Sequence, residues 1–386
     1  MIGRLTLGAL TAVLAGLGLG VVGTLLPRVP VLGLANGFVP PVMTWVVLAA
    51  LCCALLAGIV RWRSRYARVL IAAAVAVAVG GAVVIARMVS AVEDAGVDVD
   101  LLDTLRVWSD DVATPDAQET YSTYDGEPLG VSVYRPRASA GAAPVLVYIH
   151  GGGWVAGDRD ARSADLRWFA DRGWLTISVD YALSSADRHL WNVVQGQIAC
   201  ALTWVAGNAA SYGGDPARLS LSGDSAGGNL AINTAYLRAR GELQSSCGGA
   251  VPAVTAVAVA YPAVDPVDFY ANPDVLLGDT ARAMVGAYTG GSPTEFPDRY
   301  AAIASGTHLG PRAPPTLIVV GDVDHLVPVE ATRDFADAAR ALGVDTRIVS
   351  VPYADHVFDV RTGSIGQQAY RQLTANWLRD HGQAPS

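Results

Sequence analysis

The first 92 residues are dominated by long runs of apolar residues. Three runs cover residues 5–26, 41–60 and 69–86, and the last resumes beyond Arg87 as far as Val92. Because about 20 apolar residues in a helix cross a bilayer, the runs predict three membrane-spanning helices at about 5–26, 41–60 and 69–91. A cleaved secretory signal is the alternative for the first run, but its apolar core is too long and two further runs follow.

From residue 121 onward, short apolar strands alternate with helical segments. The predicted strands are 144–149, 174–179, 218–222, 254–260, 316–320 and 346–351, and the predicted helices are 161–172, 193–211, 229–237, 330–342 and 365–380. Strands that read as continuous apolar runs are buried on both faces, so the pattern predicts an α/β fold with a mainly parallel sheet between helices. We expect a transmembrane region at 1–92, a linker or cap segment at 93–120 and a globular domain at 121–386.

Three stretches are less regular. Residues 93–120 are acidic, with one amphipathic helix expected around Leu101 to Trp108. Strand-like segments on either side of Asp125-Gly126 predict a hairpin, whose turn we expect Glu127-Pro128 to lengthen. Residues 262–315 are punctuated by prolines and weakly periodic, which is typical of a lid or pocket wall.

Charge is distributed unevenly along the chain. Residues 1–92 carry seven of the 27 basic residues and none of the 35 acidic ones, so the remainder has a net charge of about −15. Such an acidic surface argues against nucleic acid as a partner. Four arginines fall within residues 61–68, and short basic loops between membrane helices stay cytoplasmic. We therefore expect a cytoplasmic N-terminus, membrane lipid around the helices, and everything after residue 92 outside the cytoplasm.

The strand at 218–222 runs into Gly223-Asp224-Ser225-Ala226-Gly227, and a helix follows at once. A serine at the apex of a strand–turn–helix bend is the geometry of a nucleophile elbow. The bend strains the backbone of the serine, and only residues without a bulky Cβ fit two positions before and after it. Gly223 and Gly227 occupy those positions. A G-x-S-x-G match arises easily by accident in a chain with 41 glycines, but between a strand and a helix it predicts Ser225 as a nucleophile.

A second glycine motif, His150-Gly151-Gly152-Gly153-Trp154, stands where the first central strand ends. Acyl transfer builds negative charge on the former carbonyl oxygen of the substrate, and backbone amides must already point toward it. Consecutive glycines let the main chain approach that closely. An ordinary glycine-rich turn is the alternative for this motif by itself, and its pairing with G-x-S-x-G favours an oxyanion hole.

A nucleophilic serine needs a base, and the base needs an orienting group. Of the six histidines, His356 stands between the last strand and the last helix, at the edge of the sheet where catalytic groups of open α/β sheets collect. Asp322 and Asp324 both follow the strand at 316–320 and are both candidates for the acid. Asp324 is favoured, since a carboxylate a few residues beyond a strand can turn back toward the next loop.

Less specific roles are expected for the residues next to His356 and Asp324. Asp355 is expected to cap or solvate its loop, and His325 to be a pocket or surface residue rather than a second base. The order Ser225, Asp324, His356 is the order found in α/β hydrolases.

Several motifs occur together within residues 125–382: His150 to Trp154 with Gly157-Asp158 behind it, Val179-Asp180-Tyr181, Tyr212-Gly213-Gly214-Asp215-Pro216 and Gly223 to Asn229. In this combination the chain resembles the hormone-sensitive-lipase-like branch of the α/β-hydrolase esterases. The resemblance implies the α/β-hydrolase fold, with Ser225 as nucleophile, His356 as base and Asp324 as acid. It also implies an oxyanion hole formed by the amides of Gly151, Gly152 and Ala226.

By this resemblance the chain is expected to be a membrane-anchored serine esterase that cleaves small-molecule or lipid esters without a metal or organic cofactor. Trp154 and Asp224 are candidates for the substrate pocket. The sequence after Tyr181 lacks the family's usual arginine and Ala-Pro-Glu, the acid loop differs from its Asp-Pro-Leu form, and its soluble members lack three membrane helices. These departures concern the substrate and the cap. An acyltransferase or amidase on the same triad is an alternative, as is a non-catalytic binding module, which an intact triad disfavours.

The four cysteines fall into two groups. Cys52 and Cys53 lie in the second apolar run and are expected to be packing residues. Cys200 and Cys247 lie in the domain expected outside the cytoplasm, where thiols can oxidise, so a Cys200–Cys247 disulfide is a hypothesis.

Overall fold

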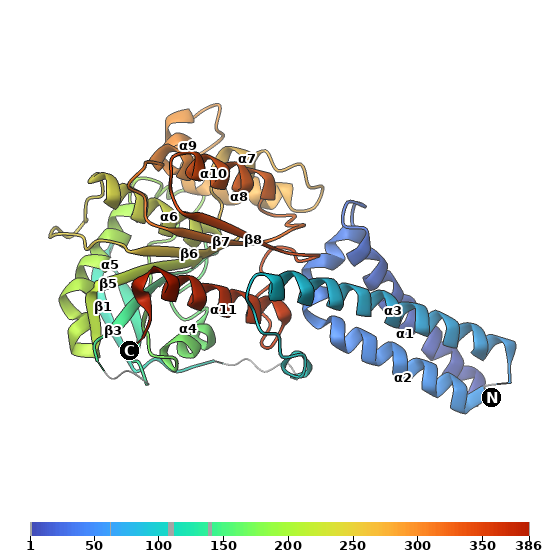
Figure 1. Cartoon of the computed structure of the whole chain (residues 1–386). Helices are drawn as coiled ribbons and strands as arrows, with labels where there is room; N and C mark the ends of the chain where they lie inside the picture. Colours follow the sequence, from blue (N-terminus) through green and yellow to red (C-terminus); the bar gives the residue numbers. More distant parts are fainter. Residues whose placement is uncertain (1, 62, 107–111, 138–140, 386) are drawn as a thin grey trace. The chain divides into compact units, whose positions relative to one another are not determined.

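The computed structural model of the chain describes residues 2–61, 63–106, 112–137 and 141–385 (Figure 1). The chain divides into two compact units. The helical unit comprises Met1–Ser109, Gly321–His325 and Ser350–Ala369, and the sheet unit comprises Asp110–Val320, Leu326–Val349 and Tyr370–Ser386. This grouping differs from a simple division near residues 93–120, because two later segments belong with the N-terminal helices.

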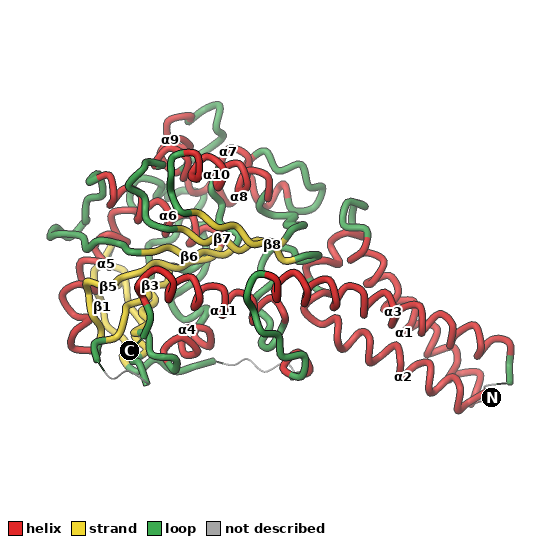
Figure 2. The backbone as a smooth tube through the Cα atoms, viewed as in Figure 1, coloured by secondary structure: helices red, strands yellow, loops and turns green. Residues whose placement is uncertain are grey.

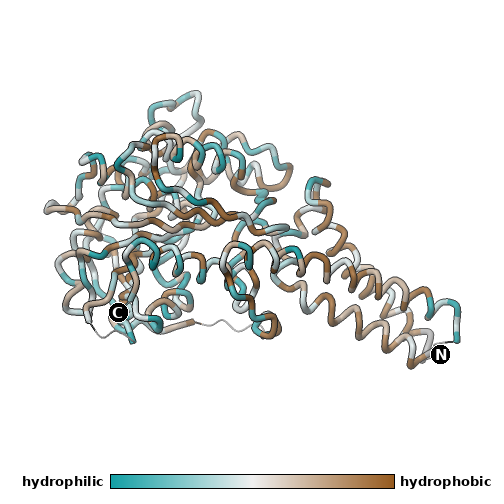
Figure 3. The backbone as a smooth tube through the Cα atoms, viewed as in Figure 1, coloured by the Kyte–Doolittle hydropathy of each residue, from teal (hydrophilic) through white to brown (hydrophobic). Residues whose placement is uncertain are grey.

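Within the described residues, three long helices make up most of the helical unit: α1 (Ile2–Leu25), α2 (Met43–Arg61) and α3 (Arg65–Asp94). They pack through small and branched apolar side chains such as Leu10, Ala57 and Ala74. Their exposed side chains include many apolar ones, such as Leu19, Leu55 and Val79, and brown predominates along the three helices in Figure 3. A helix that is apolar all round is typical of a membrane span, and each of the three is long and apolar enough to cross a bilayer. The three predicted helices are thus confirmed as helices; Trp62 lies outside the described residues.

The α1–α2 connection, residues 26–42, is compact. It contains two 3-10 turns, η1 (Leu32–Gly37) and η2 (Pro40–Val42). After α3 the chain makes a short 3-10 turn, η3 (Asp103–Leu105), and leaves helical geometry at Arg106. The amphipathic helix expected around Leu101 to Trp108 is therefore wrong as far as Arg106, and Trp108 lies outside the described residues. A helix of the expected length, about two turns, is not stable unless one of its faces packs extensively against the rest of the protein.

The described part of the sheet unit is built on an eight-stranded sheet in the order β1-β2-β4-β3-β5-β6-β7-β8. The strands are β1 (Ala117–Tyr124), β2 (Glu127–Tyr134), β3 (Ala143–Ile149), β4 (Leu175–Val179), β5 (Gly214–Asp224), β6 (Ala256–Ala260), β7 (Thr316–Gly321) and β8 (Thr346–Val351). Strand β2 is antiparallel to β1 and β4, whereas β4, β3, β5, β6 and β7 are parallel. The predicted mainly parallel sheet is confirmed, and it fits the α/β-hydrolase fold.

Helices lie on both sides of the strands (Figure 2). They are α4 (Ser163–Ala170), α5 (Val194–Asn208) with the turn η4 (Ala209–Tyr212), α6 (Ser225–Arg240), α10 (Val329–Ala341), and α11 (Ile365–Leu378) with the closing turn η6 (Arg379–Gln383). Because successive strand residues point to opposite faces, β3 serves both layers. Val145 and Val147 join the core of α5, α6 and α10, whereas Tyr148 packs with α4.

Two irregular stretches differ from expectation. The hairpin turn contains only Asp125 and Gly126, both with positive φ, and Glu127 already pairs with Tyr124. The predicted lengthening is wrong, because an Asp-Gly pair closes a two-residue turn that matches the twist of the strands. Residues 262–315 contain more helix than expected: α7 (Pro266–Tyr270), α8 (Gly278–Thr289), α9 (Pro297–Ile303) and the turn η5 (Ser305–His308).

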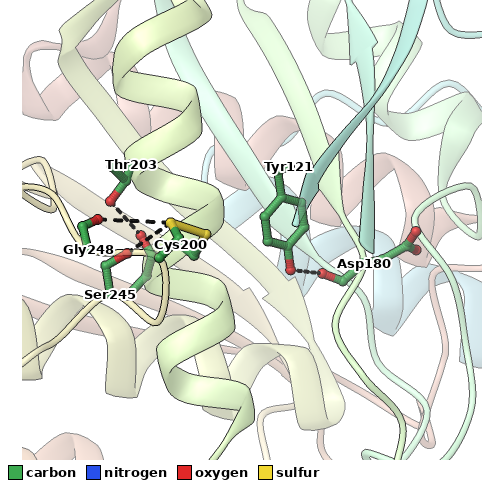
Figure 4. The surroundings of a disulfide bond; sticks show 8 residues. Tyr121, Asp180, Cys200, Thr203, Ser245 and Gly248 are labelled. Carbon is green, nitrogen blue, oxygen red and sulfur yellow. Dashed lines mark hydrogen bonds between the residues drawn. A yellow bond between two sulfur atoms is a disulfide. The ribbon is translucent and has the colours of Figure 1, made fainter. Parts of the chain in front are cut away.

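A disulfide joins Cys200 in α5 to Cys247 in the loop after α6 (Figure 4). Cys200 is fully buried, and Ser245 lies beside Cys247 at the surface. The hypothesis that these two cysteines pair is thus confirmed. Cys52 and Cys53 in α2 are free.

Candidate active site

Ser225 stands at the bend where β5 ends and α6 begins. Its φ of 52° lies in the left-handed region, which a non-glycine residue occupies only under strain. A Cβ on Gly223 would come within 2.6 Å of the Gly227 carbonyl oxygen, and one on Gly227 would overlap the carbonyl oxygen of Ile149. The expected strand–turn–helix bend is present, and its glycines allow β3, β5 and α6 to approach this closely.

The glycine loop, His150–Trp154, follows β3 beside this bend. The amide of Gly151 donates to Asp224 Oδ1 at 3.0 Å. That contact contradicts the expectation that Gly151 serves as an oxyanion donor, because its N–H already has a carboxylate partner. Gly152 and Gly153 both have positive φ, of 111° and 60°. Among the hydrogen bonds of the described residues, none uses either of these two amides as donor.

Both candidates for the substrate pocket, Trp154 and Asp224, make structural contacts. Trp154 has no exposed surface, and its ring stacks on Tyr288 with centroids 4.9 Å apart. Asp224 accepts a hydrogen bond from the Tyr148 hydroxyl as well as from the glycine loop. Trp154 is thus a core side chain, and the pocket expectation for it is corrected. Asp224 joins β3 and the glycine loop to the bend, and its place in a substrate pocket stays a prediction.

His150 is buried and supports the glycine loop. Its ring stacks on Tyr181 at 4.3 Å, and its Nδ1 donates to the Gly151 carbonyl at 2.8 Å. Burial lowers the pKa of His150 below its ordinary value of 6.5, although the hydrogen bond and nearby carboxylates oppose this shift. The fully packed imidazole therefore has a structural role beneath the glycine loop.

Asp324 and His356 form a buried pair within the helical unit. The Nδ1 atom of His356 lies 2.7 Å from Asp324 Oδ2, and the side chain of Asp324 is only 1% exposed. Asp324 follows the end of β7 and His356 follows the end of β8. Of the two candidate acids, Asp324 is the one that contacts the histidine. The other candidate, Asp322, uses its backbone amide to bind the carbonyl of Val351.

A second carboxylate–histidine pair lies next to the first. Asp355 Oδ1 accepts from the backbone amides of His325 and His356, at 2.8 and 2.7 Å, and its Oδ2 lies 2.6 Å from His325 Nδ1. Asp355 is buried, so of the two roles expected for it the solvated one is wrong, whereas capping of the loop through backbone amides is confirmed. The carboxylate ties the acid loop to the histidine loop. The sequence signal for this role is the adjacency of Asp355 to His356 and of His325 to Asp324.

The described residues thus supply two sets of groups. The bend with Ser225, Ala226 and the glycine loop belongs to the sheet unit, and the Asp324–His356 pair belongs to the helical unit. A hydroxyl on a strained turn, unused backbone amides and an imidazole oriented by a carboxylate are the parts that acyl transfer requires. Within the described residues, no group of three or more histidine, cysteine, aspartate or glutamate side chains could hold a metal ion.

The family model of BD-FAE matches residues 131–338, which is more than half of the chain. The chain belongs to the BD-FAE family. The match begins in β2 and ends in α10, so it includes the glycine loop, the Ser225 bend and Asp324, and it stops before His356.

Curated proteins similar to this chain include ester hydrolases. The probable carboxylic ester hydrolase LipM of Mycobacterium tuberculosis is 29% identical over 222 residues, which cover 57% of this chain and 50% of LipM. The carboxylesterase NlhH of the same organism is 41% identical over 116 residues, which cover 30% of this chain and 36% of NlhH. The chain spans about half the length, or less, of these relatives.

Solved structures agree in fold. Esterase 2 of Thermogutta terrifontis, in a form phosphonylated by sarin, superposes with a TM-score of 0.60 at 23% identity, covering 71% of this chain and 98% of that one. A propionate-bound structure of Est2 from the same organism gives a TM-score of 0.58 at 23% identity, covering 72% and 97%. At this level of identity the likeness shows the α/β-hydrolase fold of the BD-FAE domain.

Proposed function

We propose that this protein hydrolyses carboxylic esters, with Ser225 as nucleophile, His356 as general base and Asp324 as the acid that orients it. The observation that carries the proposal is a strained serine at the β5–α6 bend together with a buried Asp324–His356 hydrogen bond on the loops after β7 and β8. Catalytic groups of open α/β sheets gather beyond the carboxyl ends of the strands, and each of the three residues follows such an end. The ester hydrolases and esterases among the relatives support the same reaction.

The chemistry proceeds in two acyl-transfer steps. The oxygen of Ser225 attacks the ester carbonyl carbon while Nε2 of His356 takes the hydroxyl proton. The imidazolium then gives that proton to the leaving alcohol as the carbon–oxygen bond breaks, which leaves an acyl-enzyme. Water repeats the sequence and releases the acid. The Asp324 contact at Nδ1 keeps a proton on that nitrogen, so Nε2 is the one that is free to act as a base.

The oxyanion of each tetrahedral intermediate is stabilised by the amides of Gly152, Gly153 and Ala226. Gly153 replaces Gly151 in the expected set, because the Gly151 amide is bound to Asp224 whereas those of Gly152 and Gly153 have no acceptor among the described residues. Ala226 lies in the first turn of α6, where backbone amides lack partners within the helix and the helix dipole favours negative charge.

The three long helices span a membrane, with the basic residues 61–68 in the cytoplasm and the sheet unit outside. The Cys200–Cys247 disulfide supports this orientation, because such bonds persist in oxidising compartments. Contacts inside the helical unit are consistent with it. Asn36 in the α1–α2 connection donates a hydrogen bond to Tyr353, and the amide of Asp100, beyond α3, donates one to Gln368. The α1–α2 connection and the chain that follows α3 therefore both contact the segment Ser350–Ala369. Lipid surrounds the helices, and small-molecule or lipid esters are the substrates.

Activity of the full chain in detergent toward p-nitrophenyl butyrate tests the proposal. Ser225→Ala should abolish turnover and labelling by a fluorophosphonate while the melting temperature stays unchanged. Full activity in the purified variant would refute Ser225 as the nucleophile. Adding an alcohol acceptor separates hydrolysis from acyl transfer, because a transferase would release the ester of that alcohol in place of the free acid. Labelling of intact cells with a membrane-impermeant fluorophosphonate tests the orientation, and labelling only after lysis would contradict it.

A further inference from the structure

The segments that carry Asp324 and His356 belong to the same compact unit as the long N-terminal helices. Three hydrogen bonds join them to the α1–α2 connection. The side-chain amide of Asn36 donates to the Tyr353 carbonyl at 2.8 Å, and Nε2 of His325 donates to the Pro27 carbonyl at 3.1 Å. The third comes from Arg361, whose guanidinium donates to the Pro41 carbonyl at 3.0 Å. Each partner in the connection is more than 290 residues away from its contact in sequence.

The histidine loop needs support from outside itself. Tyr353 has a φ of 59° and Val357 a φ of 54°, so strained residues stand three before and one after His356. Backbone strain of this kind persists only where the surroundings fix it. Asn36 is 1% exposed and binds the carbonyl of Tyr353, one of the two strained residues. Its amide also donates to the Thr24 carbonyl in α1 at 3.2 Å, so the same side chain ties α1 to the histidine loop.

The acid loop has its own tie to the connection, through His325. Its Nδ1 faces the Asp355 carboxylate and its Nε2 faces the Pro27 carbonyl, and both of these groups accept hydrogen bonds. Only the imidazolium, with a proton on each nitrogen, donates to both at once. Pro27 lies just beyond the end of α1, where the helix dipole favours a cation. Asp355 in turn holds the backbone amide of His356, so the tie extends to the proposed base.

We propose that the α1–α2 connection positions the proposed base and its acid, so that the membrane helices form part of the catalytic scaffold as well as an anchor. This inference rests on the proposed roles of His356 and Asp324. Asn36 and His325 act as positioning residues: they hold the Tyr353 carbonyl and the Asp355 carboxylate, which in turn set the place of the imidazole. Because a displacement of about 1 Å in a reacting group can cost about a hundredfold in rate, loosening these ties should slow catalysis.

The test uses the full chain in detergent with p-nitrophenyl butyrate. Asn36→Ala removes both donors, and Asn36→Asp places oxygens against the two carbonyls. His325→Asn keeps a nitrogen near the Asp355 side and loses the reach to Pro27. Each should lower kcat about 10- to 100-fold and leave KM within about twofold, because a positioning residue acts on the base and does not bind the substrate. Phosphonylation of Ser225 by a fluorophosphonate also needs the base, although the reagent carries no ester alcohol. The rate of this labelling should fall by the same factor as kcat.

Two control variants separate positioning from general loss of packing. Tyr66→Phe breaks a contact with Thr11 inside the same bundle of helices, far from the connection in sequence, and Asn208→Ala removes a similar amide–carbonyl bond at the end of α5. Both should keep kcat within about twofold of the parent enzyme. If Asn36→Ala yields no folded protein, His325→Asn, on a side chain that is partly exposed, decides the question by the same criteria.

The outcomes are distinguishable from failure of the proposed function. An inactive His356→Ala enzyme together with slow Asn36 and His325 variants and normal controls supports the inference. An inactive His356→Ala enzyme with Asn36 and His325 variants that keep parental kcat overturns the inference and leaves the proposed function standing. Parental activity in His356→Ala would overturn the proposed function itself. Equal slowing in the variants and in both controls would also overturn the inference, because a positioning role predicts a difference.

Discussion

Replacing Cys247 by serine should destabilise the sheet unit strongly. The disulfide closes a loop with a sequence separation of 47 residues. In the chain-entropy treatment, a cross-link over such a loop removes about 14 cal/mol/K from the unfolded state, or about 4 kcal/mol at 25 °C. One kcal/mol moves the melting temperature of a domain of this size by about 2 to 4 °C. Loss of the bond should therefore lower it by about 8 to 16 °C.

The assay is thermal unfolding of the full chain in detergent, followed by loss of esterase activity after brief heating and by tryptophan fluorescence. Cys52→Ser is the matched control, because it removes a free cysteine of α2 and should leave the transition unchanged. Mass mapping without reductant should recover the two halves of the bridge as one linked peptide. Two free thiols at these positions, or a Cys247→Ser enzyme that melts within about 2 °C of the parent, would refute the reasoning.

Further predictions concern the site and its pH dependence. Asp324→Asn should lower kcat about 10⁴-fold, by favouring the wrong tautomer of His356, whereas Asp322→Asn should cost less than about tenfold; steady-state kinetics that rank them in reverse would exchange the two acids. Gly227→Ala should destabilise the chain by about 3 kcal/mol in urea unfolding, since its Cβ would overlap a β3 carbonyl oxygen, and parental stability would contradict the close approach. Burial lowers the pKa of His308 below 6.5, so the unfolded chain binds more protons below that pH and stability is lost as the pH falls, by up to about 1.4 kcal/mol per pH unit. His308→Gln keeps a donor for the Ala302 carbonyl and should lose less melting temperature between pH 7 and pH 5 than the parent; an equal loss would exclude this source.

Local sequence patterns were sufficient for the sheet, the helices that alternate with its strands, and the Ser225 bend. Continuous apolar runs mark buried strands because both faces of a parallel sheet are covered. Gly223 and Gly227 mark the bend because a Cβ atom at either position would collide with backbone atoms, either a few residues away or at the end of the adjacent strand. Asp324 could be favoured over Asp322 from its distance beyond β7. Each of these inferences depends on contacts that the local chain geometry already dictates.

The predictions for the site were wrong where a backbone or side-chain group contacts a residue that is distant in sequence. Nothing near Gly151 in sequence reveals that Asp224, 73 residues later, binds its amide. Trp154 next to a glycine motif is typical of a pocket residue, yet its ring is fully buried and stacks on Tyr288. The contacts of Asn36 and Pro27 with the histidine and acid loops are further still beyond the reach of a periodic pattern. Long-range tertiary contacts decide these roles, and the local sequence carries no trace of them.

The pairing of Pro27 with His325 and of Asn36 with Tyr353 has a consequence for biosynthesis. The partners are separated by 298 and 317 residues, so a ribosome that adds about 5 to 20 residues per second makes the second member about 15 to 60 s after the first. During that interval α1 and α2 can enter the bilayer that we propose they span, while the residue proposed as the base has yet to be made. Under the proposed roles, a chain released before residue 356 therefore carries the proposed nucleophile without its base, and ester cleavage begins only after the histidine loop has joined the α1–α2 connection.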